Sequence, residues 1–186
     1  MNTLNPITVR CLVALSFILL LSACGGGSSS SASADPIDGN SIADCEITQD
    51  EQEMLNQVNQ ARVSSRACGD DQMPAVAELS WSCDLRNAAQ VHSSDMADNN
   101  FFSHTGSDGL SVSDRVTASG YSWSSVGENI AAGQATITQV MTGWLDSPGH
   151  CRNIMSSRST EFGSALVTAA ESDYSTYWTQ VFASGS

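Results

Sequence analysis

Three histidines and one isolated glutamate are the residues of this sequence whose types and positions could support chemistry. His104 and His150 lie in glycine-flanked loops, where functional side chains are over-represented. Glu128 stands among small and apolar neighbours in Gly-Glu-Asn-Ile-Ala-Ala-Gly, and its type alone is compatible with a surface acid or a site residue. Neutral imidazoles bind Zn²⁺ and similar ions, and a nearby carboxylate can orient a ligand or a bound water. His92 differs, because it falls on the apolar face of an expected helix and is predicted to pack there.

Nucleophilic catalysis is disfavoured by the sequence. Cys151 directly follows His150, but neighbours in sequence rarely face each other, and Cys151 belongs to a set of cysteines expected to form disulfides. The serine-rich chain contains no Gly-x-Ser-x-Gly elbow of the kind that exposes a nucleophilic serine. It also lacks the His-Glu-x-x-His pattern of zinc proteases.

Residues 1–23 have the features of a signal peptide that ends at a lipidation site. Met1–Arg10 carries one positive charge, and Leu12–Leu21 is an apolar run too short to cross the roughly 30 Å core of a bilayer. The run closes on Leu-Ser-Ala-Cys, which resembles the bacterial lipobox, so Cys24 is predicted to become the lipidated first residue. Residues 24–44 continue as a flexible Gly/Ser-rich linker, and 45–186 form the folded domain.

We therefore expect an exported protein that is held in the bacterial cell envelope by a lipid anchor on Cys24. Gly25 follows it in place of the Asp associated with inner-membrane retention, which favours the outer membrane. Lys and Arg together number 7, all of them Arg, against 20 Asp and Glu, for a net charge of -13. Such a chain has few groups to displace phosphate counterions, so neither a nucleic acid nor a polybasic contact with lipid headgroups is expected.

Four cysteines remain in the expected mature domain: Cys45, Cys68, Cys83 and Cys151. An even number in an oxidising compartment indicates disulfides, and no C-x-x-C spacing suggests a zinc site. Cys68 and Cys83 are nearest in sequence, and closing a loop of about 15 residues is worth roughly 3 kcal/mol. The spacing thus predicts Cys68–Cys83, which leaves Cys45–Cys151 by subtraction.

Periodicity and capping signals place helices first and strands last. Thr48 to Glu51 matches a capping box that opens the first helix. Further helices are expected over 83–97, 113–118 and 137–145, with a helical turn at 152–155. The pattern then alternates over 162–170 and 176–183, which predicts a C-terminal β-hairpin. This order indicates one layered α+β domain.

Six short motifs follow one another between residues 79 and 182, within a similarity that covers about residues 48–183. They are Leu79-Ser-Trp81, Asn100-Phe-Phe-Ser-His104, Gly127-Glu-Asn-Ile130, Gly143-Trp-Leu-Asp-Ser-Pro-Gly-His150, Glu161-Phe-Gly163 and Tyr177-Trp-Thr-Gln-Val-Phe182. Together and in this order they resemble the CAP superfamily (cysteine-rich secretory proteins, antigen 5 and pathogenesis-related 1 proteins), also known by its SCP domain, in its compact bacterial branch. The resemblance implies an α+β fold, a three-layer α-β-α sandwich with a central antiparallel sheet.

Family members place two histidines and two acidic residues in a central cleft. By motif, His104 and His150 match the histidines and Glu128 matches the acid of the Gly-Glu-Asn motif. The resemblance implies that these three residues hold a divalent metal, Zn²⁺ or a similar ion. The alternative is a hydrogen-bonded cluster that only braces the cleft.

The position of the second family acid is occupied by Ser147, with Asp146 one residue earlier. One helical residue corresponds to a rotation of about 100°, so Asp146 is a fourth metal ligand only if the helix unwinds before Pro148.

Two classes of function follow from the resemblance. The first is a non-enzymatic envelope module whose cleft binds a divalent metal, a small or lipid-like ligand, or a partner protein. The second is a metal-dependent, protease-like hydrolase in which His104 and His150 hold the metal and Glu128 acts as base. The missing third protein ligand favours binding over catalysis.

Overall fold

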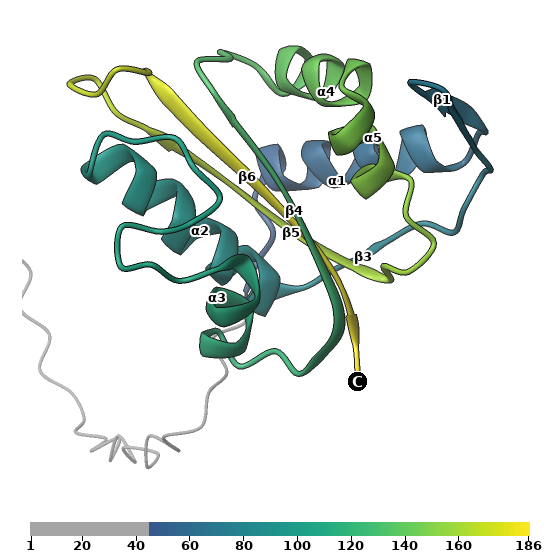
Figure 1. Ribbon diagram of the computed structural model, residues 1–186, viewed down its shortest axis with the longest axis horizontal. Helices are drawn as coiled ribbons and strands as arrows, with labels where there is room; N and C mark the ends of the chain where they lie inside the picture. Colours follow the sequence, from purple (N-terminus) through teal and green to yellow (C-terminus); the bar gives the residue numbers. More distant parts are fainter. Residues whose placement is uncertain (1–44) are drawn as a thin grey trace, which may run out of the picture. The chain divides into compact units, whose positions relative to one another are not determined.

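The computed structural model describes residues 45–186, in which helices cover both faces of one sheet (Figure 1). The predicted signal peptide, the lipidation site Cys24 and the linker lie outside these residues. None of the helices within 45–186 is both long enough and apolar enough to cross a membrane.

The described residues form five helices and six strands. The helices are α1 (Gln49–Arg62), α2 (Cys83–Asp98), α3 (Val112–Ala118), α4 (Ile137–Asp146) and α5 (Pro148–Ile154). The strands are β1 (Arg66–Cys68), β2 (Asp71–Met73), β3 (Ser80–Trp81), β4 (Trp123–Ala132), β5 (Glu161–Thr168) and β6 (Thr176–Gly185).

The central sheet has the strand order β3-β5-β6-β4, so β4 is an edge strand. Strand β6 pairs antiparallel with both β4 and β5, whereas β3 joins β5 in parallel over two residue pairs. Strands β1 and β2 form a separate antiparallel hairpin. The α+β fold and the three layers expected from the sequence are confirmed.

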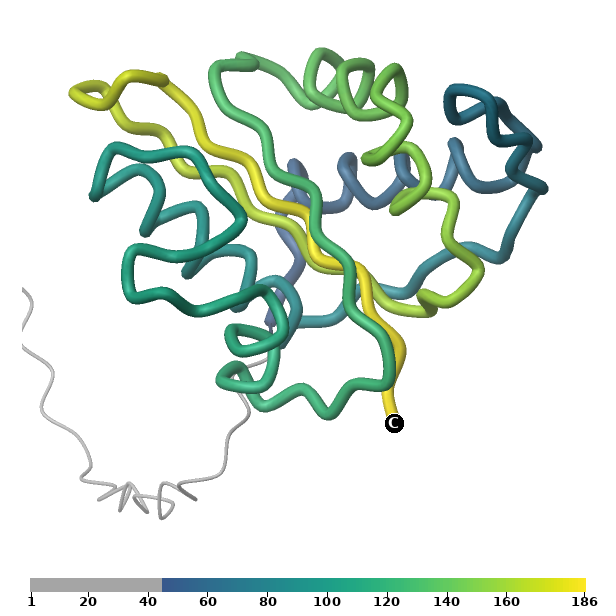
Figure 2. Tube along the Cα trace, viewed as in Figure 1, coloured from purple at the N-terminus to yellow at the C-terminus, as the bar shows by residue number. Residues whose placement is uncertain are grey.

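The two faces of the sheet are covered by different helices. Helices α1, α4 and α5 pack on one face around Phe162, Trp178 and Phe182, and helices α2 and α3 pack on the other around Val181 and Ala183. Figure 2 shows these two helical layers on opposite sides of the strands. Burial of these apolar side chains is the main force that holds the layers together.

The predicted helices begin where their caps indicate. The Thr48 hydroxyl accepts from the Glu51 N–H (3.3 Å), and the Glu51 carboxylate accepts from the Thr48 N–H (2.8 Å), so the capping box of α1 is complete. Helix α5 starts at Pro148, earlier than the turn expected at 152–155, because proline fits the first turn of a helix, where its missing N–H costs nothing.

Strand β4 was not predicted from the sequence. Its residues, Trp-Ser-Ser-Val-Gly-Glu-Asn-Ile-Ala-Ala, include polar and small side chains on both faces and do not alternate as a half-buried strand does. Helical layers cover both of its faces, and Glu128 and Asn129 are buried on opposite sides. Because polar residues are buried on both faces, the sequence of β4 does not show the alternation of apolar and polar residues that marks a half-buried strand.

A buried arginine ties the end of α1 to the segments around it. The Arg62 guanidinium, with only 1% of the residue exposed, donates to the carbonyl oxygens of Ala77 (2.7 Å), Ile154 (2.6 Å), Ser156 (2.9 Å) and Ser159 (3.4 Å). Burial lowers the pKa of Arg62, but an arginine remains charged in proteins. Its charge is therefore balanced by carbonyl dipoles.

The predicted disulfide pairing is wrong. The bonds are Cys45–Cys83 and Cys68–Cys151, with Cα atoms 5.8 and 5.4 Å apart. Cys68 ends β1 beside α5, which carries Cys151, whereas Cys83 begins α2 in the opposite helical layer. The segment from Cys68 to Cys83 therefore runs from one helical layer to the other, and the two cysteines are too far apart to form a disulfide.

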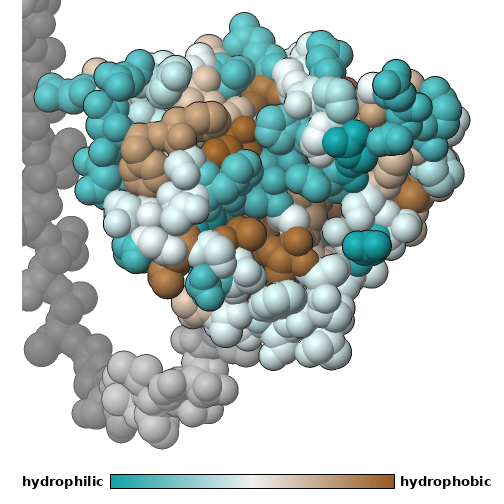
Figure 3. Space-filling model, viewed as in Figure 1, coloured by the Kyte–Doolittle hydropathy of each residue, from teal (hydrophilic) through white to brown (hydrophobic). Residues whose placement is uncertain are grey.

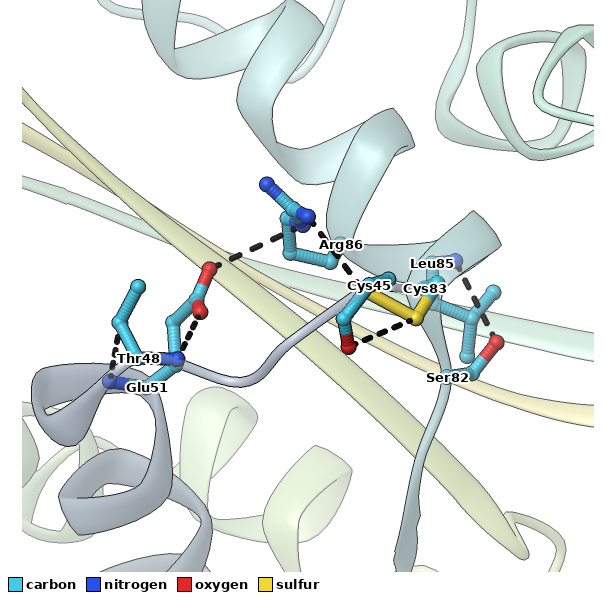
Figure 4. The surroundings of a disulfide bond; sticks show 7 residues. All are labelled: Cys45, Thr48, Glu51, Ser82, Cys83, Leu85 and Arg86. Carbon is cyan, nitrogen blue, oxygen red and sulfur yellow. Dashed lines mark hydrogen bonds and ion pairs between the residues drawn. A yellow bond between two sulfur atoms is a disulfide. The ribbon is translucent and has the colours of Figure 1, made fainter. Parts of the chain in front are cut away.

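Contacts at the start of α1 and α2 surround the first disulfide. Figure 4 shows Cys45 bonded to Cys83, with the Arg86 side chain reaching the Cys45 sulfur (3.3 Å) and Glu51 (3.8 Å). The two bonds close loops of 38 and 83 residues. By lowering the entropy of the unfolded chain, each bond stabilises the folded domain by about 4 kcal/mol. Both bonds join elements that are distant in the sequence.

We predict that Gly163→Ala destabilises the domain by about 3 kcal/mol, because α2 crosses β5 at this residue without room for a side chain. A Cβ atom at Gly163 would lie 2.2 Å from the Arg86 nitrogen and 2.4 Å from the Leu85 carbonyl carbon. Urea unfolding measures the loss. Gly143→Ala is the control, because nothing lies within 4 Å of its Cβ and it sits within α4. Equal stability of the two variants would contradict the close approach.

Candidate functional site

The centre of the candidate site is a buried ion pair between α3 and β4. Arg115 and Glu128 are 5% and 6% exposed, and a guanidinium nitrogen lies 2.6 Å from Glu128 Oε2. Taking both charges out of water is costly, so neither is stable there without the other. Arg115 therefore balances the charge of Glu128 and fixes the orientation of its carboxylate.

His104 occupies the other oxygen of this carboxylate. Its Nδ1 lies 2.7 Å from Glu128 Oε1, so in the tautomer that satisfies this contact Nδ1–H donates and Nε2 carries the free lone pair. The His104 side chain is 58% exposed, which leaves Nε2 accessible from solvent. Arg115 also donates to the carbonyl oxygens of His104 (3.2 Å) and Leu110 (2.9 Å). One guanidinium thus holds both the acid and the loop that carries the histidine.

His150 reaches the site from the first turn of α5. Burial lowers the pKa of His150, and the imidazole of His104 lowers it further. The two imidazoles are therefore close enough for a charge on one to disfavour a charge on the other. The Asn129 amide donates to the His150 carbonyl (3.3 Å), and the Asn153 amide donates to Asn129 Oδ1 (2.9 Å) and to the Glu128 carbonyl (3.0 Å). This amide network fixes α5 against β4.

His92 packs beneath the site, as the sequence predicts. It is fully buried on α2, and its Nε2 lies 2.9 Å from the Ser103 carbonyl oxygen, so Nε2–H is the donor. Burial lowers the pKa of His92, partly offset by Glu128, whose Oε1 is 3.9 Å away. His92 is therefore a neutral side chain that holds the main chain at Ser103, the residue before His104, by a hydrogen bond.

The residues present fit a metal held by two imidazoles better than one held by three or four protein ligands. Both oxygens of Glu128 are engaged, one by Arg115 and one by His104, so the carboxylate orients His104 and is not free to ligate. Asp146 is exposed at the last residue of α4. In residues 45–186 no group of three or more His, Cys, Asp or Glu side chains is arranged to hold an ion.

A cleft of about 280 Å³ opens beside His150. Its walls are mostly apolar and come from β4, α4, the segment after α2 and the β5–β6 turn. Besides His150, the lining residues are Phe102, Ile130, Ala131, Ala132, Gln134, Val140, Gly143, Trp144, Ser147 and Tyr174. The cleft can accept an apolar group next to the His150 imidazole.

Sequence reasoning identified His104, His150 and Glu128 but missed Arg115 and the amides of Asn129 and Asn153. Arginine is usually a surface residue, and nothing in its local pattern marks Arg115 as buried. The helix itself was predicted over 113–118, and the capping box at Ser111 marks its start, but neither gives the direction of the arginine side chain.

The family model described as "CAP: Cysteine-rich secretory protein family" matches residues 55–182. The chain belongs to this family. The protein YkwD of Bacillus subtilis (strain 168) is 36% identical over 98 residues, which cover 53% of this chain and 36% of YkwD. The chain therefore spans about a third of the length of this relative.

Solved structures agree with the CAP assignment. An extracellular SCP-domain protein of Bacillus anthracis str. Ames has a TM-score of 0.58 and 27% identity, with 72% of this chain and 40% of that protein covered. An outer surface protein of Borrelia burgdorferi has a TM-score of 0.64 and 16% identity, with 76% of this chain and 96% of that protein covered, and supports the fold alone. The resemblance inferred from the six motifs is confirmed.

We predict that this CAP domain loses stability as the pH falls below about 6.5, because buried His92 is neutral when folded and protonates more readily when unfolded. A lowered folded pKa means that the unfolded state binds more protons in this range, so stability rises with pH. His92→Gln keeps a donor for the Ser103 carbonyl and removes the titration. Urea unfolding at pH 7.5 and pH 5 should show a smaller difference for this variant than for the parent.

The control for this experiment is His150→Gln, because the pKa of His150 is also lowered but the residue is only partly buried. An unchanged pH difference in His92→Gln would show that the buried histidine does not set it.

Proposed function

We propose that this protein is a non-enzymatic binding module of the bacterial cell envelope. Its cleft holds a divalent metal, Zn²⁺ or a similar ion, reversibly on His104 Nε2 and His150, and it accepts a small or lipid-like ligand or part of a partner protein. The single observation that supports binding most strongly is the state of Glu128, whose two carboxylate oxygens are both engaged, by Arg115 at 2.6 Å and by His104 at 2.7 Å.

A metal-dependent hydrolase requires more than this arrangement offers. Catalytic zinc sites have three protein ligands and an open position, and a separate base takes the proton from the attacking water. Glu128 is the candidate base, but the Arg115 guanidinium stabilises its charge and His104 occupies its other oxygen. Neither oxygen of this carboxylate is therefore free to face an attacking water. The geometry therefore supports reversible binding.

The envelope location rests on the N-terminal sequence and on the kind of relatives found. The run before Cys24 matches a signal peptide with a lipobox, and Gly25 favours the outer membrane. Similar folds occur in a protein named as extracellular and in one named as an outer surface protein. Two disulfides in residues 45–186 agree with an oxidising compartment.

We predict that Zn²⁺ binds the folded domain at pH 7.5 and that binding weakens steeply toward pH 5, as protons compete for the imidazoles. His104→Ala and His150→Ala should each abolish most of the affinity, since one imidazole is a poor site. Glu128→Gln should weaken it about tenfold by loosening His104. Calorimetric titration measures all three variants.

His92→Gln is the matched control for the zinc titration and should bind like the parent. No binding by the parent at pH 7.5 would favour a cluster that only braces the cleft. Turnover of casein with Zn²⁺ that disappears in Glu128→Ala would instead establish the hydrolase.

We also predict that Cys24→Ser releases the protein from membranes or leaves an unprocessed precursor, because the thiol that would carry the lipid is gone. Membrane fractionation and the mass of the mature protein measure the effect. Normal processing with unchanged membrane association would contradict lipidation.

A further inference from the structure

The last residues of β4 present main-chain groups that the sheet does not use. In the antiparallel register, Gly127, Asn129 and Ala131 face Phe182, Gln180 and Trp178. The Gly133 N–H donates to the Thr176 carbonyl (2.9 Å), so hydrogen-bonded positions fall on the odd numbers. Antiparallel ladders alternate, so the even-numbered residues Glu128, Ile130 and Ala132 direct their N–H and C=O groups out of the sheet edge.

Side chains occupy part of this edge but not its end. The Asn153 amide donates to the Glu128 carbonyl (3.0 Å), and the Trp144 indole donates to the Ile130 carbonyl (3.1 Å). Within residues 45–186 no hydrogen bond engages the outward N–H and C=O of Ala132. Ala132 is partly exposed and lines the cleft. The strand edge is therefore closed at Glu128 and open where it meets the cleft.

Aromatic side chains stand next to this open edge. Phe102 and Tyr174 are 47% and 43% exposed, and their ring centroids lie 6.1 Å apart. They face the cleft from the segment after α2 and from the β5–β6 turn, while Val140 and Trp144 line it from α4. Figure 3 shows hydrophobic surface on this face, in the region where the end of α2 and the end of β4 lie in Figure 1.

We propose that the open end of β4 binds an extended peptide segment, which pairs with the main chain of Ala132 and buries one bulky apolar side chain between Trp144 and the Phe102–Tyr174 pair. Peptides that add to a sheet edge gain affinity from main-chain hydrogen bonds and specificity from a pocket for an alternate side chain. Both features occur together here. The inference rests on the proposed binding role of the cleft and names the class of ligand.

An acyl chain is a less suitable occupant than a peptide. It would fill the apolar walls but would cover the Ala132 N–H and C=O without offering them a partner, and an unpaired polar group out of water is costly. A peptide main chain supplies one acceptor and one donor at the required spacing. Because Arg115 neutralises Glu128, the adjoining site adds no net negative charge that would demand a basic ligand.

The test uses the acetylated, amidated tetrapeptide Ser-Phe-Val-Ser, titrated calorimetrically into the full mature domain in EDTA. Ala132→Pro removes the outward N–H without removing a bond to β6, and proline is tolerated where the N–H points away from the sheet. It should weaken binding about tenfold. Val126→Pro is the matched control, because Val126 also points its N–H outward but lies outside the cleft, and its affinity should equal that of the parent.

Two further probes make the result independent of how well the proline variants fold. The same peptide with methylated Phe and Val nitrogens should bind at least about tenfold more weakly to the parent. Decanoate should bind no more tightly than that methylated peptide. Equal affinity for both peptides, or preference for decanoate, would overturn the proposal in favour of an apolar site. Absence of saturable binding in the millimolar range would also overturn it.

The design separates this inference from the metal-binding proposal. Peptide binding in EDTA should persist in His104→Ala, whereas zinc binding should not. If the parent does not bind zinc, the peptide proposal is unaffected. If the parent does not bind the peptide, the metal-binding proposal is unaffected.

Discussion

The ion pair between Arg115 and Glu128 is the interaction on which the cleft depends. A carboxylate buried between a sheet face and a helix loses its hydration, which is costly unless an opposite charge compensates it. Here an arginine from a seven-residue helix compensates the charge and donates two further hydrogen bonds, to the carbonyls of His104 and Leu110. The loop after α2 is therefore organised by electrostatics, because few apolar side chains are available to hold it.

The second half of the cleft is held by neutral groups. Asn129 and Asn153 connect β4 to α5 through amide contacts, and Gln180 continues the network by accepting from Asn129 (3.1 Å). Buried amides give direction to packing that apolar contacts alone would leave adjustable. Charged groups thus position His104, and amide groups position His150. Both sets of contacts include Glu128: its carboxylate contacts His104, and its main-chain carbonyl accepts from the Asn153 amide.

The sequence was sufficient to predict features that depend on local pattern. The capping box at Thr48, the apolar period of α4 and the alternation in β5 and β6 each arise from neighbours a few residues apart, and each element was found. The position of Cys83 opposite Cys45 depends on how the layers stack, which no spacing reveals. Strand β4 was missed for a related reason, since its buried Glu128 and Asn129 pair with residues from α3 and α5 that are distant in the sequence.

The bond between Cys45 and Cys83 has a mechanical consequence. A pull on the chain ahead of Cys45 passes through the disulfide to the first turn of α2, and α1 lies inside the closed covalent loop, outside the path of the force. At Gly163 the backbone of α2 is in close contact with β5, so the force reaches a central strand instead of peeling away the first helix. A load applied ahead of Cys45 therefore enters the domain near its middle and bypasses its first helix.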